Sequence, residues 1–300
     1  MTYYTLTPFK KQYFFPENFK DYSLFDNFYN PYSLKAKIYF WLWRRFSLIR
    51  FCCRILNIED FLSIDILDKF NNNNVLIAYN TGTLGTEQKI TALGLNIKTK
   101  EEFFLKYADN KLSVKNVKNE TSILLQLKTN DFAPTLIESF SSEYHSYFKT
   151  NVIKGNRNFS HFKIDKVLKL VIKISEQDIN AENKSSSNLK LCFSHGDFTP
   201  WNMMLHKGNF KVYDWESAGY YTLGYDLFTY LIQSFILLKT HNSFLDLINQ
   251  NKFTISKYFK HFKIQKWEPY LIAFIECKIK LTSGNDIHND YLTIIKYYKK

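Results

Sequence analysis

The sequence predicts an α+β fold in two lobes, and three observations lead to that prediction. Before Asn71 the apolar spacing is helical, over residues 34–57 and 58–70. From Val75 the pattern changes to short apolar and aromatic runs of strand character. After Tyr220 the chain is long, apolar and mostly helical. A strand-rich middle followed by a helical half is typical of α+β architecture.

The middle of the chain alternates strands with two helices. The expected helices cover residues 112–127 and 161–175, and the Gly-rich stretch 81–86 is expected to be a turn that closes a hairpin. The expected strands are 75–79, 88–93, 101–108, 144–153, 191–195 and 210–214. The last two strands flank a loop that is rich in polar side chains, so we expect the chemistry to lie there.

Composition excludes several classes of protein. With 45% hydrophobic and 18% aromatic residues, the chain builds a sizeable core, which excludes wholesale disorder. The four cysteines form no CxxC pair, so neither a disulfide framework nor a zinc site is expected. The N-terminus lacks the apolar core and cleavage site of a signal peptide. These observations predict a protein with reduced thiols in the cytoplasm.

The net charge of +12 does not by itself indicate an anionic partner. Only five of the 40 basic residues are Arg, and the Lys residues are spread along the chain. A diffuse Lys excess favours solubility rather than a defined interface. No helix-turn-helix, zinc-finger or RNP-like signature is present, so no nucleic-acid partner is expected.

The candidate chemistry lies between Ser194 and Leu227. Asp197 and Asn202 stand five positions apart in the loop after one strand, and Asp214 ends the next strand. Carboxylate and amide oxygens that converge from two strand ends suit Mg²⁺, which prefers hard oxygen ligands. Phosphoryl transfer needs such a metal clamp, together with a carboxylate that orients the attacking hydroxyl.

Each of these residues also has a purely structural interpretation. Gly196 and Asp197 fit an ordinary turn, Asp214 a strand-end cap, and Asp226 a charge at a helix N-terminus. Taken singly those interpretations are favoured. If all the structural interpretations held, the five-residue spacing of Asp and Asn and the strand that follows would both be coincidences. The chemical interpretation explains them together and is therefore preferred.

The segment HGDFTPWN, residues 195–202, resembles the HxDxxxxN catalytic-loop motif of the aminoglycoside phosphotransferase and choline kinase family. The DWE stretch at 214–216 stands where protein kinases, which are relatives of that family, carry DFG. The resemblance implies a bilobal protein-kinase-like fold, with a strand-rich N-lobe, a mainly helical C-lobe and here an N-terminal helical extension.

The resemblance also implies a role for each matched residue. Asp197 is expected to be the catalytic base, Asn202 a metal ligand and Asp214 the main metal ligand. His195 is expected to orient the loop, and Asp226 to brace it from the following helix.

Upstream of the catalytic-loop motif, three further features resemble parts of the same family's pattern. Gly82 and Gly85 lie in a turn between two strands, which resembles the nucleotide loop but is explained nearly as well as an ordinary hairpin. Lys106 lies inside an apolar strand, where its ammonium needs a partner, and Glu120 on the next helix is the candidate. Lys89 is the rival for that place, and a Lys106 that snorkels at a sheet edge is the structural alternative.

The expected organisation has three parts. Residues 1–74 form the helical extension, 75–150 the N-lobe with the nucleotide loop, and 151–300 the C-lobe with the catalytic loop and substrate-binding helices. The hinge is expected near Lys149–Gly155, and Mg²⁺-ATP is expected beneath the Gly-rich turn.

The resemblance implies an ATP-dependent kinase that moves the γ-phosphate to a hydroxyl of a small molecule or sugar, with Mg²⁺ as cofactor. Two alternatives stay open: a catalytically silent nucleotide-binding regulator, against which the intact site residues argue, and a basic membrane-surface binding protein. Only scattered acids follow Thr222, which disfavours a polycationic acceptor.

A cluster of arginines falls within a segment rich in aromatic residues, residues 38–56. Arg44, Arg45, Arg50 and Arg54 punctuate it too often for a membrane span. It is interpreted either as a helix that packs aromatics on the N-lobe or as a surface for anionic headgroups or a phosphorylated substrate. The second interpretation places the protein at the inner face of the membrane, with a lipid-linked or surface-polysaccharide sugar as acceptor.

Overall fold

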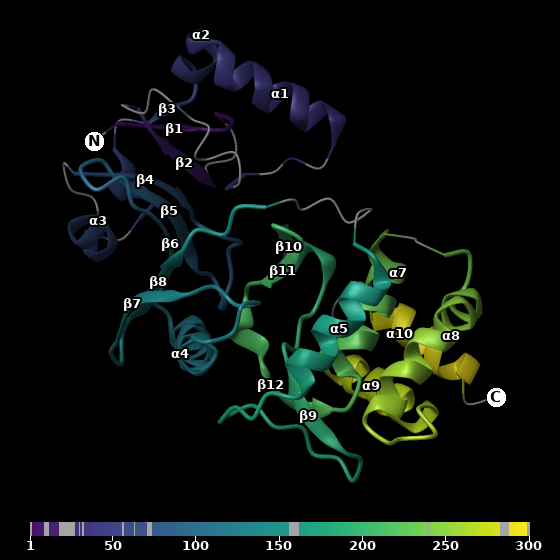
Figure 1. The fold of residues 1–300 in the computed structure, drawn as a ribbon. Coiled ribbons are helices and arrows are strands. Elements are labelled where there is room, and N and C mark those ends of the chain that lie inside the picture. The colour runs from purple at the N-terminus through teal and green to yellow at the C-terminus, as the bar shows by residue number, and fades with distance from the viewer. Residues whose placement is uncertain are drawn as a thin grey trace. The chain divides into compact units, whose positions relative to one another are not determined.

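The computed structural model describes most of the chain, and the chain divides into two compact units (Figure 1). The first unit comprises residues 1–121 and 134–154, and the second 122–133 and 155–300. Each is described by itself. The described residues are 2–8, 12–17, 28, 29, 31, 33–55, 57–62, 64–70, 74–155, 162–238, 241–282 and 288–298.

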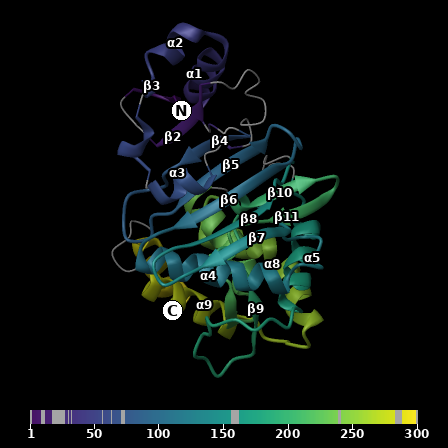
Figure 2. The same cartoon turned by 90° about the vertical axis from the view of Figure 1, so that its left-hand side faces the viewer.

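The first unit is built on an eight-stranded antiparallel sheet, in the order β3-β1-β2-β4-β5-β6-β8-β7. Figure 2 shows its central strands side by side. The strands are β1 (Tyr3–Thr5), β2 (Tyr13–Pro16), β3 (Arg54–Ile55), β4 (Val75–Asn80), β5 (Ile90–Asn96), β6 (Glu102–Ala108), β7 (Leu136–Ser141) and β8 (Ser146–Asn151).

Helices supply the core on both faces of this sheet. Successive side chains of a strand point to opposite faces, so Ile77 of β4 packs in one apolar cluster and Ala78 in the other. The first cluster includes Phe70 of α3, and the second includes Phe40 and Trp43 of α1. The helices of this unit are α1 (Leu34–Arg45), α2 (Ser47–Phe51), α3 (Ile64–Phe70) and most of α4 (Lys111–Gln126).

The expected helical extension over residues 1–74 is wrong. The N-terminal segment contains helices, but its strands β1, β2 and β3 are part of the sheet, and β2 pairs directly with β4. The helix expected over 34–57 breaks at Phe46, whose backbone is extended, and its last residues form β3. Strands of two to four residues are stabilised by pairing with distant neighbours, so local spacing does not reveal them.

The second unit is mainly helical and carries two short β-ribbons. Its helices are α5 (Ile164–Ser175), α6 (Tyr225–Phe228), α7 (Ser234–Leu238), α8 (Phe244–His261), α9 (Glu268–Leu281) and α10 (His288–Tyr298). In the ribbons, β9 (Leu191–Ser194) pairs with β12 (Gly219–Thr222), and β10 (Met203–His206) pairs with β11 (Asn209–Val212).

The two strands expected around the polar loop therefore belong to different ribbons. The loop after β9 leads into β10, and the turn after β11 leads into β12, which returns to pair with β9. This crossing brings the ends of β9 and β11 together in one unit. The chain passes from the first unit to the second at Lys154–Gly155, within the segment where the hinge was expected.

None of the helices in the described part of the chain combines the length and apolar character that a membrane span needs.

The role of α1 in the core can be tested with two tryptophans on one helix. Trp43 is fully buried and its indole nitrogen donates to the carbonyl of Thr5 at 3.0 Å, whereas Trp41 is 60% exposed. We expect Trp43→Ala to lower the free energy of unfolding by about 3–5 kcal/mol. The matched Trp41→Ala is expected to change it by no more than about 0.5 kcal/mol. Equal losses in urea unfolding would contradict this assignment of the two helix faces.

Candidate active site

A buried carboxylate holds the loop that follows β9. Asp226, in the first turn of α6, is only 1% exposed and accepts the backbone N–H groups of His195 at 2.7 Å and Gly196 at 3.1 Å. Burial raises the pKa of Asp226, while the two backbone donors act in the opposite direction. The carboxylate therefore braces the loop, as the resemblance implied for this position.

His195 links the loop to the neighbouring ribbon. Its ring is fully buried, with Nε2 at 3.1 Å from the carbonyl oxygen of Tyr213 and Nδ1 accepting the backbone N–H of Asp197 at 3.3 Å. A neutral ring with its proton on Nε2 satisfies both hydrogen bonds. The Trp215 ring meets the His195 ring edge-on at 4.6 Å and fixes its plane.

Gly196 is required by close packing of two turns. Its φ is 86°, in the left-handed region, and a Cβ placed there would lie 2.2 Å from the carbonyl oxygen of Ser217. A side chain at this position is therefore excluded both by conformation and by contact. The loop that carries Asp197 thus lies against the backbone of the turn that carries Asp214.

Asp197 and Asn202 form one hydrogen-bonded unit. The Asn202 amide nitrogen donates to Asp197 Oδ2 at 2.9 Å and to the Asp197 carbonyl at 3.0 Å. Asp197 Oδ1 has no hydrogen-bond partner among the described residues, and its side chain is partly exposed. One oxygen of the carboxylate is therefore fixed, and the other is left to accept a proton or a hydrogen bond. The Asn202 amide also turns its own oxygen away from Asp197.

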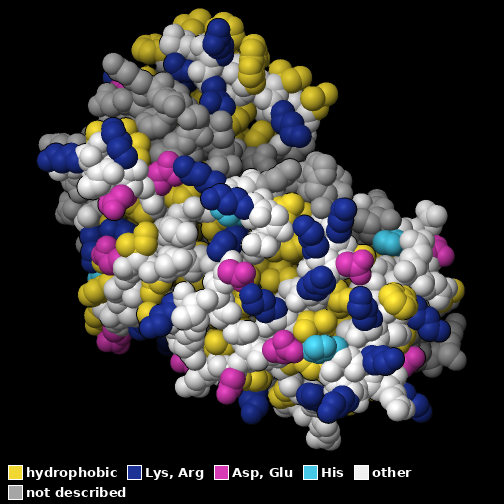
Figure 3. Space-filling view, viewed as in Figure 1, with side chains coloured by type: hydrophobic (Ala, Val, Ile, Leu, Met, Phe, Trp, Pro, Cys, Tyr) yellow, Lys and Arg dark blue, Asp and Glu magenta, His cyan; other side chains and the backbone are white. Residues whose placement is uncertain are grey.

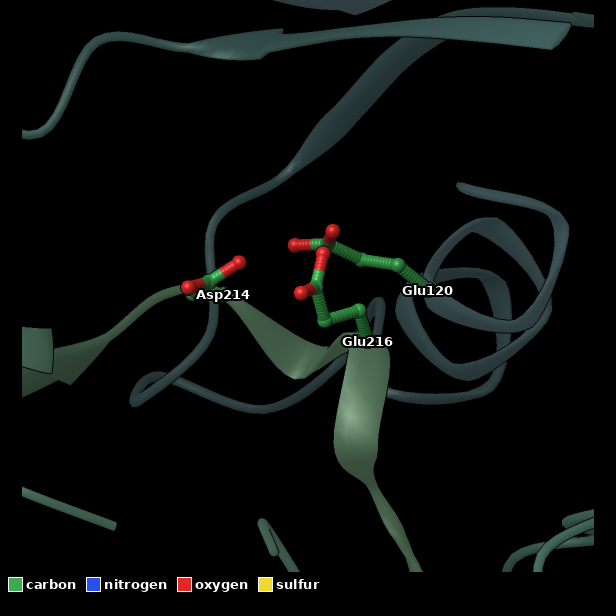
Figure 4. Close-up of side chains that lie close together, drawn as sticks. All are labelled: Glu120, Asp214 and Glu216. Carbon is green, nitrogen blue, oxygen red and sulfur yellow. The ribbon is translucent and has the colours of Figure 1, made fainter. Parts of the chain in front are cut away.

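The turn after β11 presents two carboxylates. Asp214 has φ 71° and ψ 57°, a left-handed conformation that is uncommon for residues with a side chain and concentrates at functional sites. Carboxylate oxygens of Asp214 and Glu216 lie within 4.8 Å of one another. Figure 4 shows both extending to the same side of the turn, and it also shows Glu120 on α4.

The chemistry of these donors fits a divalent cation. Two carboxylates and the side-chain oxygen of Asn202 are hard oxygen ligands, which Mg²⁺ and Ca²⁺ prefer. The strand end brings them near each other, because the Tyr213 backbone N–H donates to the Asn202 carbonyl at 3.1 Å. Glu216 was quoted in the sequence motif without a role of its own, and its position adds it to the candidate ligands.

In the first unit, Lys106 pairs with Glu120 as predicted. The Lys106 ammonium on β6 lies 2.5 Å from a carboxylate oxygen of Glu120 on α4, and both side chains are buried. A buried charge needs such a partner. Lys106 is therefore neither a snorkelling edge residue nor replaced in this place by Lys89.

The Gly-rich stretch forms the predicted turn between β4 and β5. Gly82 has φ 70°, and a Cβ there would lie 2.5 Å from the carbonyl oxygen of Lys89. Asn80 Oδ1 accepts the Gly82 N–H at 2.9 Å, and Gly85 also has positive φ, at 152°. The hairpin is thus confirmed, while the binding of a nucleotide by this turn stays a prediction.

The sequence analysis missed two residues near Asp197. Lys278 on α9 is 8% exposed, and its ammonium lies 4.9 Å from the centroid of the Tyr225 ring. Burial lowers the pKa of Lys278, and the charges of Asp197 and Asp226 act in the opposite direction. Burial and the charge of Asp197 raise the pKa of Tyr291 on α10, whose hydroxyl has no partner among the described residues.

A basic residue inside an apolar helix was the only signal for Lys278. Tyr291 was one aromatic residue among many, so nothing in the sequence marked it. Among the predicted site residues, those that the second unit brings together are His195, Asp197, Asn202, Asp214 and Asp226. The first unit brings together Lys106 and Glu120. Gly82 and Gly85 lie in a separate turn, between β4 and β5.

A family model matches the part of the second unit that carries this arrangement. Residues 163–240 match the model of the phosphotransferase enzyme family. The match contains the loop after β9, the turn after β11 and all of α6, and it confirms the resemblance and the enzyme class predicted from the sequence. It does not reach Lys106 or the Gly-rich turn. No curated protein sequence matches the chain.

One solved structure confirms the α+β kinase-like fold, and two others are similar at lower scores. Amicoumacin kinase hAmiN, in complex with AMP-PNP, Ca²⁺ and Ami, matches with a TM-score of 0.52 and 10% identity over 80% of this chain and 93% of that chain. Aminoglycoside phosphotransferase APH(3'')-Id from Streptomyces rimosus gives 0.47 and 10% over 70% and 93%. Aminoglycoside-3'-phosphotransferase of type VIII gives 0.41 and 13% over 52% and 77%.

The brace formed by Asp226 can be tested by removing its charge alone. In Asp226→Asn the amide accepts one of the two backbone N–H groups but turns its own NH₂ toward the other. We expect the free energy of unfolding to fall by about 1–3 kcal/mol, with activity lowered in parallel. The exposed Asp109→Asn is the matched control and should be near neutral. Unchanged urea unfolding of Asp226→Asn would contradict the brace.

Proposed function

We propose that this protein is an ATP-dependent phosphotransferase that moves the γ-phosphate of ATP to a hydroxyl group of a small molecule. The observation that supports it best is the Asp197 carboxylate, with one oxygen fixed by Asn202 and the other unpartnered among the described residues. The match of residues 163–240 to a phosphotransferase family supports the same reaction.

Asp197 acts as the catalytic base in this proposal. Its Oδ1 accepts the proton of the acceptor hydroxyl as that oxygen forms a bond to the γ-phosphorus of ATP, and ADP leaves with the electrons of the broken P–O bond. Phosphoryl transfer passes through a loose transition state, so alignment of the acceptor oxygen matters more than the strength of the base. The hydrogen bonds from Asn202 and His195 keep Asp197 in a fixed position for this task.

Asp214, Asn202 and Glu216 are the residues that would hold the divalent metal, for which we propose Mg²⁺. A metal held by these oxygens would supply positive charge to offset that of the phosphates. The fold likeness is to a kinase whose solved complex contains AMP-PNP and Ca²⁺, which supports a nucleotide with a divalent cation here as well. Lys106, held by Glu120, supplies the cation for the ATP phosphates, and the Gly82–Gly85 turn covers them.

The acceptor is proposed to be an alcohol without a cluster of positive charges. Lys278 already places one buried ammonium near Asp197 and Asp226, and the rings of Tyr225 and Phe274 lie beside it. A polycationic acceptor would bring further ammonium groups toward this one, which costs free energy in a buried site. Neutral or anionic sugars and polyols fit better.

The role of Asp197 predicts a selective loss of turnover. Asp197→Asn preserves the shape of the side chain but removes its proton-accepting capacity. We expect kcat to fall by roughly 10²–10⁴-fold with ATP affinity little changed. The measurement is phosphate transfer with Mg²⁺-ATP to an acceptor found by screening sugars, polyols, amino alcohols and aminoglycosides. Near-normal transfer by Asp197→Asn would remove the basis of the enzyme assignment.

The role of Asp214 predicts a loss of Mg²⁺-dependent ATP binding. Asp214→Asn retains a residue that tolerates the left-handed backbone but removes one metal-binding charge. We expect weaker ATP binding in the presence of Mg²⁺ and no change in its absence, as measured by calorimetry. Asp197→Asn serves as the control, since it should bind Mg²⁺-ATP like the wild type. The metal assignment fails if Asp214→Asn shows the same Mg²⁺-dependent gain in ATP affinity as the wild type.

A further inference from the structure

Helices α1 and α2 expose an unusual amount of apolar surface. Five large apolar side chains on them, and Phe46 between them, are 48–74% exposed, and Figure 3 shows hydrophobic and basic side chains gathered over this part of the molecule. We call these residues the α1–α2 face: Leu34, Ile38, Trp41, Phe46, Leu48 and Phe51. Contiguous apolar surface of this kind commonly marks a site of interaction with a protein or a membrane.

Helix α1 is apolar on two opposite sides. Phe40 and Trp43 are buried against the sheet, whereas Leu34, Ile38 and Trp41, spaced by four and three residues, share the opposite side and face solvent. The core therefore accounts for only one side of the helix. The other side needs a different explanation, because exposing Trp and Ile to water costs free energy.

Exposed basic side chains border this face on α1, and the two helices themselves carry no acidic ones. Lys35, Lys37 and Arg45 on α1 are exposed, and neither α1 nor α2 contains an Asp or Glu. On a helix with 3.6 residues per turn, Lys35 and Lys37 fall on either side of the stripe formed by Leu34, Ile38 and Trp41. An apolar stripe with cations along both edges is the arrangement found in helices that lie in a lipid interface.

The arginine cluster of the sequence analysis divides into two groups. The Arg50 guanidinium donates to the carbonyls of Trp43 and Arg44 at 2.9 and 2.6 Å, so it closes the C-terminus of α1. Arg54 forms an ion pair with Glu17 at 3.2 Å. These two therefore serve the fold. The cations proposed for an interface are the exposed Lys35, Lys37 and Arg45 of α1, of which the sequence analysis did not consider the two lysines.

We propose that the α1–α2 face binds the surface of a membrane that contains anionic lipids. The apolar side chains enter the boundary between headgroups and acyl chains, Trp41 and the two Phe residues lie at the interface level, and the flanking cations meet lipid phosphates. The described helices contain no candidate membrane span, so attachment is peripheral.

Charge complementarity selects this occupant over two others. A second copy of the chain would bring Lys35, Lys37 and Arg45 against their own equivalents, and like charges in an interface oppose association. A nucleic acid would match the cations but would leave the aliphatic side chains of Leu34, Ile38 and Leu48 in contact with water and phosphate. Of these three occupants, the anionic lipid surface is the one that accepts both kinds of side chain.

The test is co-sedimentation of the full chain with vesicles of phosphatidylcholine, with and without phosphatidylglycerol. We expect binding to the phosphatidylglycerol vesicles, a loss of binding at high salt, and a blue shift of tryptophan fluorescence that disappears in Trp41→Ser. The double variant Trp41→Ser with Lys37→Glu should lower the partition coefficient roughly tenfold or more. Both residues are exposed, so the fold should be retained.

A matched double variant on α8 separates this surface from general charge and hydrophobicity. Phe253→Ser with Lys252→Glu makes the same chemical change at two exposed neighbours and should leave vesicle binding unchanged. Equal losses in the two double variants would overturn the proposal. So would binding to RNA without binding to vesicles, or dimerisation in solution that Trp41→Ser abolishes in the absence of lipid. Vesicle binding is measured without ATP or acceptor, so this test stands apart from the proposed phosphoryl transfer.

Discussion

The candidate active site depends on one buried carboxylate that binds backbone rather than substrate. Asp226 accepts two N–H groups at the start of the loop after β9, and from there hydrogen bonds continue through the ring of His195 to Asp197 and to the carbonyl of Tyr213. In a buried environment such linked bonds reinforce one another. The same network therefore positions the proposed base and the strand end that carries Asp214.

Sequence reasoning located this network because most of its members are close in the chain. The spacing of Asp197 and Asn202 and the aspartate after the next strand are local features, and the structure joins them through short loops. The partner of Lys106 was also predictable, since a cation in an apolar strand needs a carboxylate and Glu120 is on the helix that follows. In these cases the contact can be inferred from the spacing along the chain and from the free-energy cost of burying a polar group without a partner.

The features that were missed are non-local. β1, β2 and β3 are too short to show a periodic pattern, and they exist because β2 pairs with β4 across a long stretch of chain. Lys278 and Tyr291 reach the neighbourhood of Asp197 from the last two helices, which no spacing rule connects to the loop. Likewise, the exposed side of α1 became visible only once its buried side was known.

The contact between Gly196 and Ser217 has a consequence for how this enzyme class can vary. No side chain lies between the two turns at Gly196, so the contact of their main chains sets the separation of Asp197 from Asp214. No side chain at this contact can be exchanged for a longer or shorter one to change that separation. A new acceptor cannot be accommodated by widening the gap between the turns that carry Asp197 and Asp214. Lys278 and Tyr291 approach Asp197 from separate helices, so substitutions at those two positions leave the contact between the turns unchanged.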